Sequence, residues 1–311
     1  MSIESGRSLE GDFDAPGRLA TQGSGRPPRG DFDAPDQLVT KARKENFPVA
    51  SHLLPSDVRS DLMAIYGFAR LTDDLGDQAE GDRLELLDWL EAELERAAAA
   101  KASHLVLRQL TPVIRRLDLD LDPFRSLIEA NRMDQRVKRY QSFGDLVDYC
   151  MLSAAPVGRL VLAVFGVSTP ERIAFSDKVC IGLQVVEHLQ DIGEDAKQDR
   201  IYMPADDMEQ FGCTEGELLA NEASPALRRL VAMEVTRTRG LLAAAAPLAA
   251  SLRFRPRAAV VGFAAGGSAA LDSIERAGND VLRHRCSPGK LAFATRAASL
   301  LVSSSVKRRR S

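Results

Sequence analysis

Apolar residues return every three or four positions through most of the chain after Asp36, which is the spacing of one face of an α-helix. No segment alternates between apolar and polar residues for long enough to predict a β-sheet. Short breaks rich in Gly, Pro and Asp separate the periodic segments, as in bundles of antiparallel helices. We therefore predict one all-α domain over residues 36–300. Its predicted helices cover residues 58–75, 84–100, 105–117, 124–137, 146–165, 173–192, 227–252 and 258–282.

The two ends of the chain differ from this pattern. Residues 1–35 are rich in Gly, Pro, Arg, Asp and Ser, which predicts a disordered N-terminal extension. The sequence GDFDAP occurs twice there, at 11–16 and 30–35, as a partner-binding motif or, more simply, as a duplication in unconstrained sequence. Residues 301–311 form a basic C-terminal tail that ends in VKRRRS. The tail would contact an anionic membrane surface or, as the simpler interpretation, stay solvated.

Composition narrows the class of protein. The 311 residues are 45% hydrophobic and carry a net charge of −3, so bulk electrostatics predict no nucleic-acid partner. The four cysteines are widely spaced and form no CxxC pair, which favours a reducing setting. The sequence contains no secretion signal and no uninterrupted apolar run long enough to span a membrane. We expect a cytoplasmic protein, with contact to the inner face of the cell membrane left open by the basic tail.

The stretch AIYGFARLTDDLGD, residues 64–77, carries a polar stripe on an otherwise apolar helix. Tyr66, Arg70, Asp73 and Asp77 fall three or four residues apart and share one face. Surface helices have the opposite proportion of polar and apolar residues. The pattern therefore predicts a buried helix whose stripe faces an internal, solvated cavity.

The stretch GLQVVEHLQDIGEDAKQDRIYMP, residues 182–204, repeats this pattern. Its polar face contains Gln184, Glu187, His188, Asp191, Glu194 and Asp195. Carboxylates that face each other across a cavity repel unless a cation lies between them, and oxygen ligands one helical turn apart suit Mg²⁺. Arg70 and Arg200 could hold a diphosphate beside such an ion. One DxxxD is usually a solvated helix face, but two within apolar helices favour a metal site, with His188 as a wall residue.

In these stretches, and in DYCMLSAAPVGRLVLAVFG at residues 148–166, the chain resembles the squalene/phytoene synthase family over residues 44–300. The resemblance implies a class I terpenoid synthase fold, a single helical bundle around a central cavity. It implies a head-to-head prenyl transferase that uses two or three Mg²⁺ ions. The implied metal ligands are Asp73, Asp77, Asp191 and Asp195. Glu187, where much of the family has Asn, is a further candidate ligand.

The resemblance also assigns residues around the substrate. Those implied to surround the diphosphates and prenyl chains are Phe47, Tyr66, Arg70, Gln184, Arg200 and Tyr202. In the third motif it implies a kinked cavity helix that includes Tyr149, Ser153, Ala154, Pro156, Val157 and Gly158. Tyr66, Tyr149 or the departing diphosphate would accept the final proton.

The stretch KENFPVASHLLP, residues 44–55, resembles one branch of this family in particular. Many family members have His-Ser here, and the Asn-Phe-Pro version resembles the bacterial hydroxysqualene synthase branch, which is associated with hopanoid synthesis. This branch implies Mg²⁺-dependent conversion of presqualene diphosphate to hydroxysqualene, without NADPH. Asn46 would then be a catalytic residue that holds the attacking water, and a helix cap is the simpler alternative for it.

Two alternatives stay open. The same fold could instead catalyse the head-to-head condensation that forms presqualene diphosphate, squalene or phytoene. The second alternative is a non-catalytic helical assembly factor, and the acidic stripes argue against it because a scaffold gains nothing from buried carboxylates that repel. The expected partners are a prenyl diphosphate substrate, neighbouring enzymes of the squalene pathway and, through the basic tail, a membrane surface.

Overall fold

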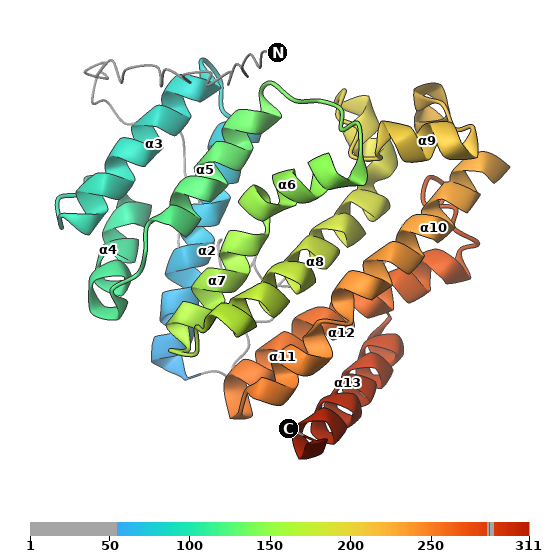
Figure 1. Ribbon diagram of the computed structural model, residues 1–311. Helices are drawn as coiled ribbons and strands as arrows, with labels where there is room; N and C mark the ends of the chain where they lie inside the picture. The colour runs from blue at the N-terminus through green and yellow to red at the C-terminus, as the bar shows by residue number, and fades with distance from the viewer. Residues whose placement is uncertain (1–54, 285, 287–288, 311) are drawn as a thin grey trace, which may run out of the picture.

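The computed structural model describes residues 55–284, 286 and 289–310, and the predicted all-α fold is confirmed there (Figure 1). Within these residues, an isolated bridge between Arg139 and Ile201 is the only β-type pairing. The longer helices are α2 (Ser56–Asp77), α3 (Arg83–Ala98), α4 (Leu105–Leu117), α5 (Asp122–Asp134), α6 (Phe143–Ser153), α7 (Ala155–Val164), α8 (Pro170–Lys197), α10 (Pro225–Leu242), α12 (Phe254–Arg276) and α13 (Lys290–Arg310). The short ones are α9 (Ala205–Phe211), the 3₁₀ helix η2 (Glu215–Leu219) and α11 (Ala245–Ser251).

Side-chain caps begin several helices where the sequence changes from polar to apolar residues. At the start of α3, Asp82 accepts a hydrogen bond from the Leu84 amide at 2.9 Å. Thr169 caps α8, and Ser142 forms a capping box with Asp145 at the start of α6. Because these side chains satisfy backbone donors that the helix itself leaves open, they define where each helix begins.

Two segments predicted as single helices are each divided in the structure. The segment 146–165 ends as α6 at Ser153 and continues as α7, so the predicted interruption beside Pro156 is confirmed. The segment 227–252 divides into α10 and α11, with Pro247 in the first turn of α11. Proline lacks the amide that a continuous helix needs but is tolerated in a first turn, so each helix restarts shortly before its proline.

The sequence pattern did not predict α9, η2 or α13. The helix α13 runs through the segment that we predicted as a basic tail. The side of α13 that packs on the molecule carries small and polar residues such as Ala297 and Ser304. Leu291 and Val302 are instead 82% and 66% exposed, so apolar residues do not mark the core-facing side from which a helix is predicted. Arg296 instead ties α13 to α12, because its Nε donates to Asp272 Oδ2 at 2.7 Å.

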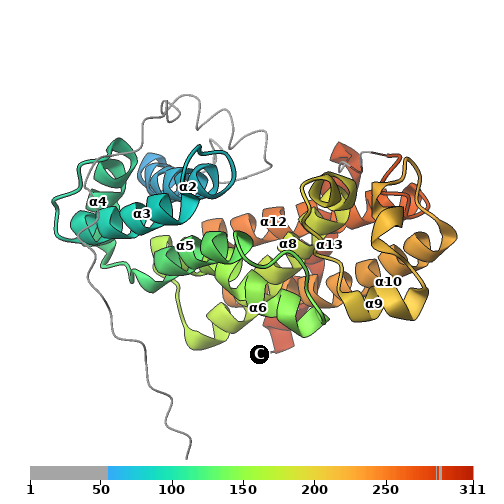
Figure 2. The same ribbon diagram turned by 90° about the horizontal axis from the view of Figure 1, so that it is seen from above.

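The helices form two packed regions. The first buries residues of α2, α3, α4, α5 and α7, with the Phe68 and Phe124 rings edge to face at 5.1 Å. The second buries residues of α6, α8, α10 and α12. Figure 2 shows α2–α4 at one end of the molecule and α9 and α10 at the other, with α5, α6 and α8 between them. The two helices with polar stripes, α2 and α8, therefore belong to different packed regions.

The stretch Phe143–Val164, which comprises α6 and α7, is the one helical segment among the described residues that is long and apolar enough to cross a membrane. It has 22 residues, and 50% of its apolar window is buried inside the protein. Both helices contribute to the packed regions described above. A core helix has the same length and composition, and the burial of this segment fits that role.

Candidate active site

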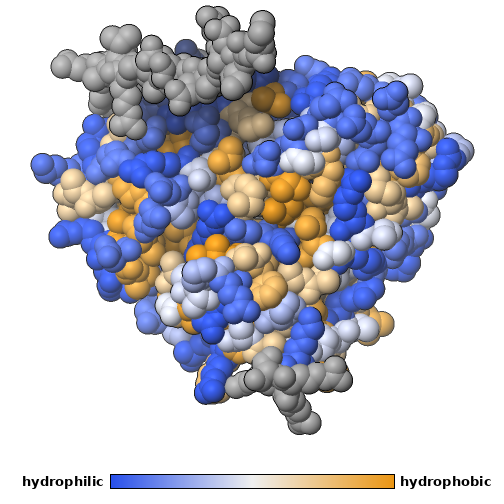
Figure 3. Space-filling model, viewed as in Figure 1, coloured by the Kyte–Doolittle hydropathy of each residue, from blue (hydrophilic) through white to orange (hydrophobic). Residues whose placement is uncertain are grey.

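The first polar stripe lies along α2. Tyr66 is buried, whereas Asp73 and Asp77 reach solvent in the last turns of the helix. Arg70 pairs with Asp74 on the same helix, at 2.8 Å between Nη2 and Oδ1. The stripe therefore runs from the core to the surface and carries both signs of charge. Figure 3 shows hydrophilic residues among apolar ones in the middle of the face that Figure 1 presents.

Asp73 lies beside α5. Asn131 Nδ2 donates to Asp73 Oδ1 at 3.4 Å. Gly76 permits this approach, since a Cβ there would lie 2.1 Å from Asn131 Oδ1. The protein packed around Asp73 raises the pKa of this carboxyl above its usual range. The bond from Asn131 opposes the shift, and the charge of Asp77 adds to it. A cation at this position would stabilise the charged form.

The second polar stripe follows α8. Glu187 and Asp191 are exposed, Gln184 and Asp195 are half-buried, and His188 is buried. The His188 ring lies between two residues of its own helix: Nδ1 is 3.9 Å from Asp195 Oδ2, and Nε2 is 3.4 Å from Gln184 Nε2. This position suits a hydrogen-bonded wall residue, which is the role that the sequence predicts for His188.

The two stripes meet at Arg200, just after the end of α8. Its Nη2 donates to Asp77 Oδ1 at 2.6 Å across 123 residues of sequence. The loop is held by two backbone bonds of 2.9 Å, from the Arg200 amide to the Asp195 carbonyl and from the Ile201 amide to the Lys138 carbonyl. Burial lowers the pKa of Arg200, but the bond to Asp77 outweighs it and raises the pKa, so the guanidinium stays charged. The ends of α2 and α8 thus share one positioned cation.

A buried aromatic cluster lies beside this ion pair. The Tyr202 ring stacks on His188 with centroids 3.7 Å apart and packs near Tyr140 and Tyr149, at 5.7 and 5.6 Å. Asp134 accepts hydrogen bonds from the hydroxyls of Tyr149 at 2.8 Å and Tyr202 at 3.2 Å. Burial raises the pKa of Asp134 and of both tyrosines, so the phenols stay protonated and act as donors.

Among the residues that the structure describes, no group of three or more His, Cys, Asp or Glu side chains lies close enough to hold a metal ion. The predicted ligands form two pairs, Asp73 with Asp77 and Asp191 with Asp195, and Glu187 precedes the second pair by one turn. Separate carboxylate pairs fit Mg²⁺, which takes oxygen ligands and completes its coordination with water and phosphate oxygens. The raised pKa of Asp73 fits as well. Binding of Mg²⁺ by these residues stays a prediction.

Asn131 and Asp134 are site residues that the sequence reasoning missed. They are 8% and 7% exposed and lie three residues apart on α5. The signal was present, because two polar residues with this spacing on an apolar helix repeat the pattern of the two stripes. Asn46, Phe47 and the GDFDAP repeat lie outside the described residues, and their predicted roles stay predictions.

Shortly after the interruption between α6 and α7, Gly158 lies against α8. A Cβ there would lie 2.4 Å from Ser176 Oγ and 2.5 Å from Cys180 Sγ. Gly158 therefore lets α7 pack closely on α8. Its neighbours Ala154 and Pro156 are buried as well.

Comparison of the sequence with known proteins identifies the family to which the chain belongs. The model of the family described as squalene/phytoene synthase matches residues 40–292. The chain is 40% identical over 202 residues to the hydroxysqualene synthase of Zymomonas mobilis, over 64% of this chain and 67% of that one. It is 38% identical over 217 residues to the hydroxysqualene synthase of Rhodopseudomonas palustris, over 68% and 72% of the two chains.

A solved structure extends the match to three dimensions. The crystal structure of the squalene synthase HpnC from Alicyclobacillus acidocaldarius superposes with a TM-score of 0.74 at 42% identity, over 81% of this chain and 95% of that one. The predicted class I terpenoid synthase fold and the resemblance to the hydroxysqualene synthase branch are thereby confirmed. The chain belongs to the squalene/phytoene synthase family and is a prenyl diphosphate-dependent synthase.

Proposed function

We propose that the protein converts presqualene diphosphate to hydroxysqualene. The carbon–oxygen bond to the diphosphate breaks with its electron pair on the leaving group, and the carbocation rearranges before a water molecule captures it. That water forms the new carbon–oxygen bond and loses one proton. Presqualene diphosphate and water thus give hydroxysqualene, diphosphate and a proton. No carbon is reduced in this reaction, so the reaction needs no NADPH.

The observation that carries this proposal is the contact between Arg200 and Asp77, because it joins a cation to the acidic stripes at one place. A magnesium diphosphate requires that combination of charges. The residues that would hold Mg²⁺ are Asp73, Asp77, Asp191, Asp195 and Glu187. When bound, Mg²⁺ supplies Lewis acidity toward the diphosphate oxygens. Arg70 and Arg200 would bind the same diphosphate, with Gln184, Tyr66 and Tyr202 along the prenyl chains.

Asp134 offers a destination for the proton. The Tyr149 phenol is neutral, so it can accept a proton from the attacking water only while it passes its own proton to Asp134, 2.8 Å away. Burial raises the pKa of Asp134, which makes this carboxylate a better base than an exposed one. Tyr66 and the departing diphosphate are the competing acceptors.

The identity of the product is supported by the names of the two relatives, both hydroxysqualene synthases. The Asn-Phe-Pro sequence at residues 46–48 supports the same branch. In this proposal Asn46 holds the attacking water, and the hydroxysqualene formed is a precursor for hopanoid synthesis.

The test is to incubate the purified full chain with presqualene diphosphate and Mg²⁺, with and without NADPH, and to identify products by mass. We expect a hydroxylated C30 product in both reactions. Squalene that appears only with NADPH would contradict the proposed product. Phytoene formed in a separate incubation with geranylgeranyl diphosphate would contradict it as well. The Asp73→Asn variant measures the background of spontaneous hydrolysis.

A further inference from the structure

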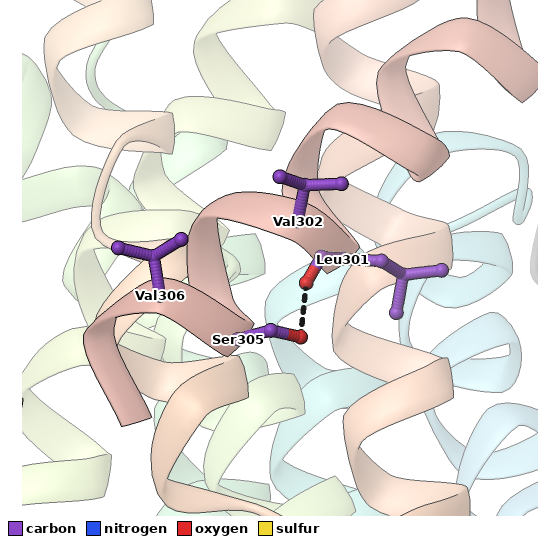
Figure 4. A pocket seen from close by; sticks show the side chains of 4 residues that line it. All are labelled: Leu301, Val302, Ser305 and Val306. Carbon is purple, nitrogen blue, oxygen red and sulfur yellow. Dashed lines mark hydrogen bonds between the residues drawn. The ribbon is translucent and has the colours of Figure 1, made fainter. Parts of the chain in front are cut away.

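The helix α13 lies along the lower right edge of the molecule in Figure 1, and several of its apolar side chains are exposed. The exposed fractions of Leu301, Val302 and Val306 are 43%, 66% and 47%. Figure 4 shows these three side chains around a shallow hollow, with the Ser305 hydroxyl donating to the Leu301 carbonyl at 2.7 Å. Their spacing places them on one side of the helix. Adjacent exposed apolar side chains make this face a candidate binding surface.

A further exposed apolar side chain, that of Phe254, lies at the same end of the molecule. Phe254 is 87% exposed, and its backbone adopts a φ of +48°, which is uncommon and unfavourable for a bulky residue. Arg253 and Arg255 flank it in a second shallow hollow. Arg257, one turn later on α12, donates to the Ser304 hydroxyl of α13 at 2.8 Å. The start of α12 and the end of α13 are therefore adjacent.

The chain segments that carry these side chains are basic, although the exposed Asp57 lies next to Val58, which lines the same hollow as Phe254. The sequence contains no Asp or Glu in 235–271 or in 281–311, although the whole chain carries a net charge of −3. Lys307 and the three arginines that follow it in the sequence end α13, and Arg253 and Arg255 add to them. Exposed apolar side chains among basic residues match the chemistry of an anionic lipid surface.

We propose that this end of the molecule docks on the surface of an anionic lipid bilayer, as a peripheral contact with the inner face of the cell membrane. We call this set the docking surface: Arg253, Phe254, Arg255, Leu301, Val302, Val306 and Lys307. Its apolar side chains would enter the boundary between headgroups and acyl chains, and its basic residues would bind lipid phosphates. A second copy of the chain is a poorer occupant, because a symmetric contact would bring two positive surfaces together.

Vesicle co-sedimentation with the full chain tests this docking surface. We expect binding to vesicles of phosphatidylcholine mixed with phosphatidylglycerol and no binding to pure phosphatidylcholine, with a loss of binding as salt rises. Val302→Ser and Phe254→Ser should each weaken binding about tenfold. Replacement of Lys307, Arg308, Arg309 and Arg310 by Gln should weaken it at least as much, since each basic residue near the surface contributes to binding.

Leu105→Ser is the matched control, because Leu105 is 53% exposed but lies on α4, away from the docking surface. This variant should bind vesicles like the unchanged protein, and melting temperatures should show that all variants are folded. Equal binding to neutral and anionic vesicles, or equal weakening by Leu105→Ser and Val302→Ser, would overturn the proposal. A dimer that Val302→Ser separates, in a protein that binds no vesicles, would assign the surface to a second copy. The test measures vesicle binding alone, so its outcome does not depend on the reaction or the product proposed above.

Discussion

Arg200 Nη2 lies 2.6 Å from Asp77 Oδ1, and this contact joins the loop after α8 to the last turn of α2. The Arg200 side chain is 14% exposed and that of Asp77 is 42% exposed. A mostly buried cation thus reaches a carboxylate at the surface. Arg200 therefore holds the loop after α8 against the end of α2.

We expect Arg200→Gln to lower turnover about a hundredfold or more, because it removes a cation positioned for the leaving diphosphate. Steady-state kinetics of diphosphate release measure this effect. Arg125→Gln is the control, since Arg125 pairs with Glu95 at 2.6 Å on the surface of another part of the molecule. Equal losses in the two variants would show that the effect is not specific to Arg200.

Asp73→Asn and Asp191→Asn should each cut turnover by orders of magnitude if the two stripes share one metal cluster. The helical circular dichroism signal and the cooperativity of melting should be unchanged, since both side chains are exposed. Asp148→Asn changes an exposed carboxylate of α6 outside the predicted ligand set and should retain full turnover. Near-normal turnover of either stripe variant at saturating Mg²⁺ would refute a shared cluster.

Gly76→Ala should destabilise the protein by about 1–3 kcal/mol, because the new Cβ forces Asn131 away from its position. The bond from Asn131 to Asp73 would be lost with it, so turnover should fall as well. Gly266→Ala on α12 is the matched control, since a Cβ there meets no atom within 4 Å. Alanine favours a helix by up to about 1 kcal/mol over glycine, so the control should be neutral or stabilised. Chemical denaturation of both variants measures whether each substitution lowers or raises the free energy of unfolding.

Glu234 should make stability depend on pH. This fully buried carboxyl lies 2.7 Å from Arg237, yet burial raises its pKa from 4.5 to about 8. The folded state holds the proton more tightly than the unfolded state, so the stabilisation is complete below about pH 4.5 and is lost as the pH rises to about 8.

Glu234→Gln mimics the neutral form and should flatten this dependence, which amounts to at most about 1.4 kcal/mol per pH unit. Denaturant titrations at several pH values measure the slope for both proteins. Glu222→Gln, at an exposed position on the surface, should leave the slope unchanged. An unchanged slope in Glu234→Gln would contradict the assignment.

Removal of residues 1–35 should leave folding and turnover intact. Their sequence has too little apolar content to offset the entropy of ordering them. Turnover, melting temperature and solubility of the truncated protein provide the test. A large loss in any of these would indicate that the GDFDAP repeat binds the helical domain.

The sequence by itself determined the helical class and the two polar stripes. The predicted helix 105–117 coincides with α4, and the stripes lie on α2 and α8 as predicted. Helical periodicity and the spacing of Asp73 with Asp77, or of Asp191 with Asp195, are properties of neighbouring residues. The periodicity alone predicted one helix over 146–165, and the interruption beside Pro156 was implied by the family resemblance.

Only the tertiary structure decided which distant residues meet. The contacts of Arg200 with Asp77 and of Asp134 with Tyr149 depend on how separate helices pack. The sequence did not predict the exposed apolar face of α13 for a related reason. An apolar residue in a sequence predicts burial, whereas Val302 is 66% exposed. Packing between helices depends on the shape and charge of surfaces from different parts of the chain, which a local pattern does not specify.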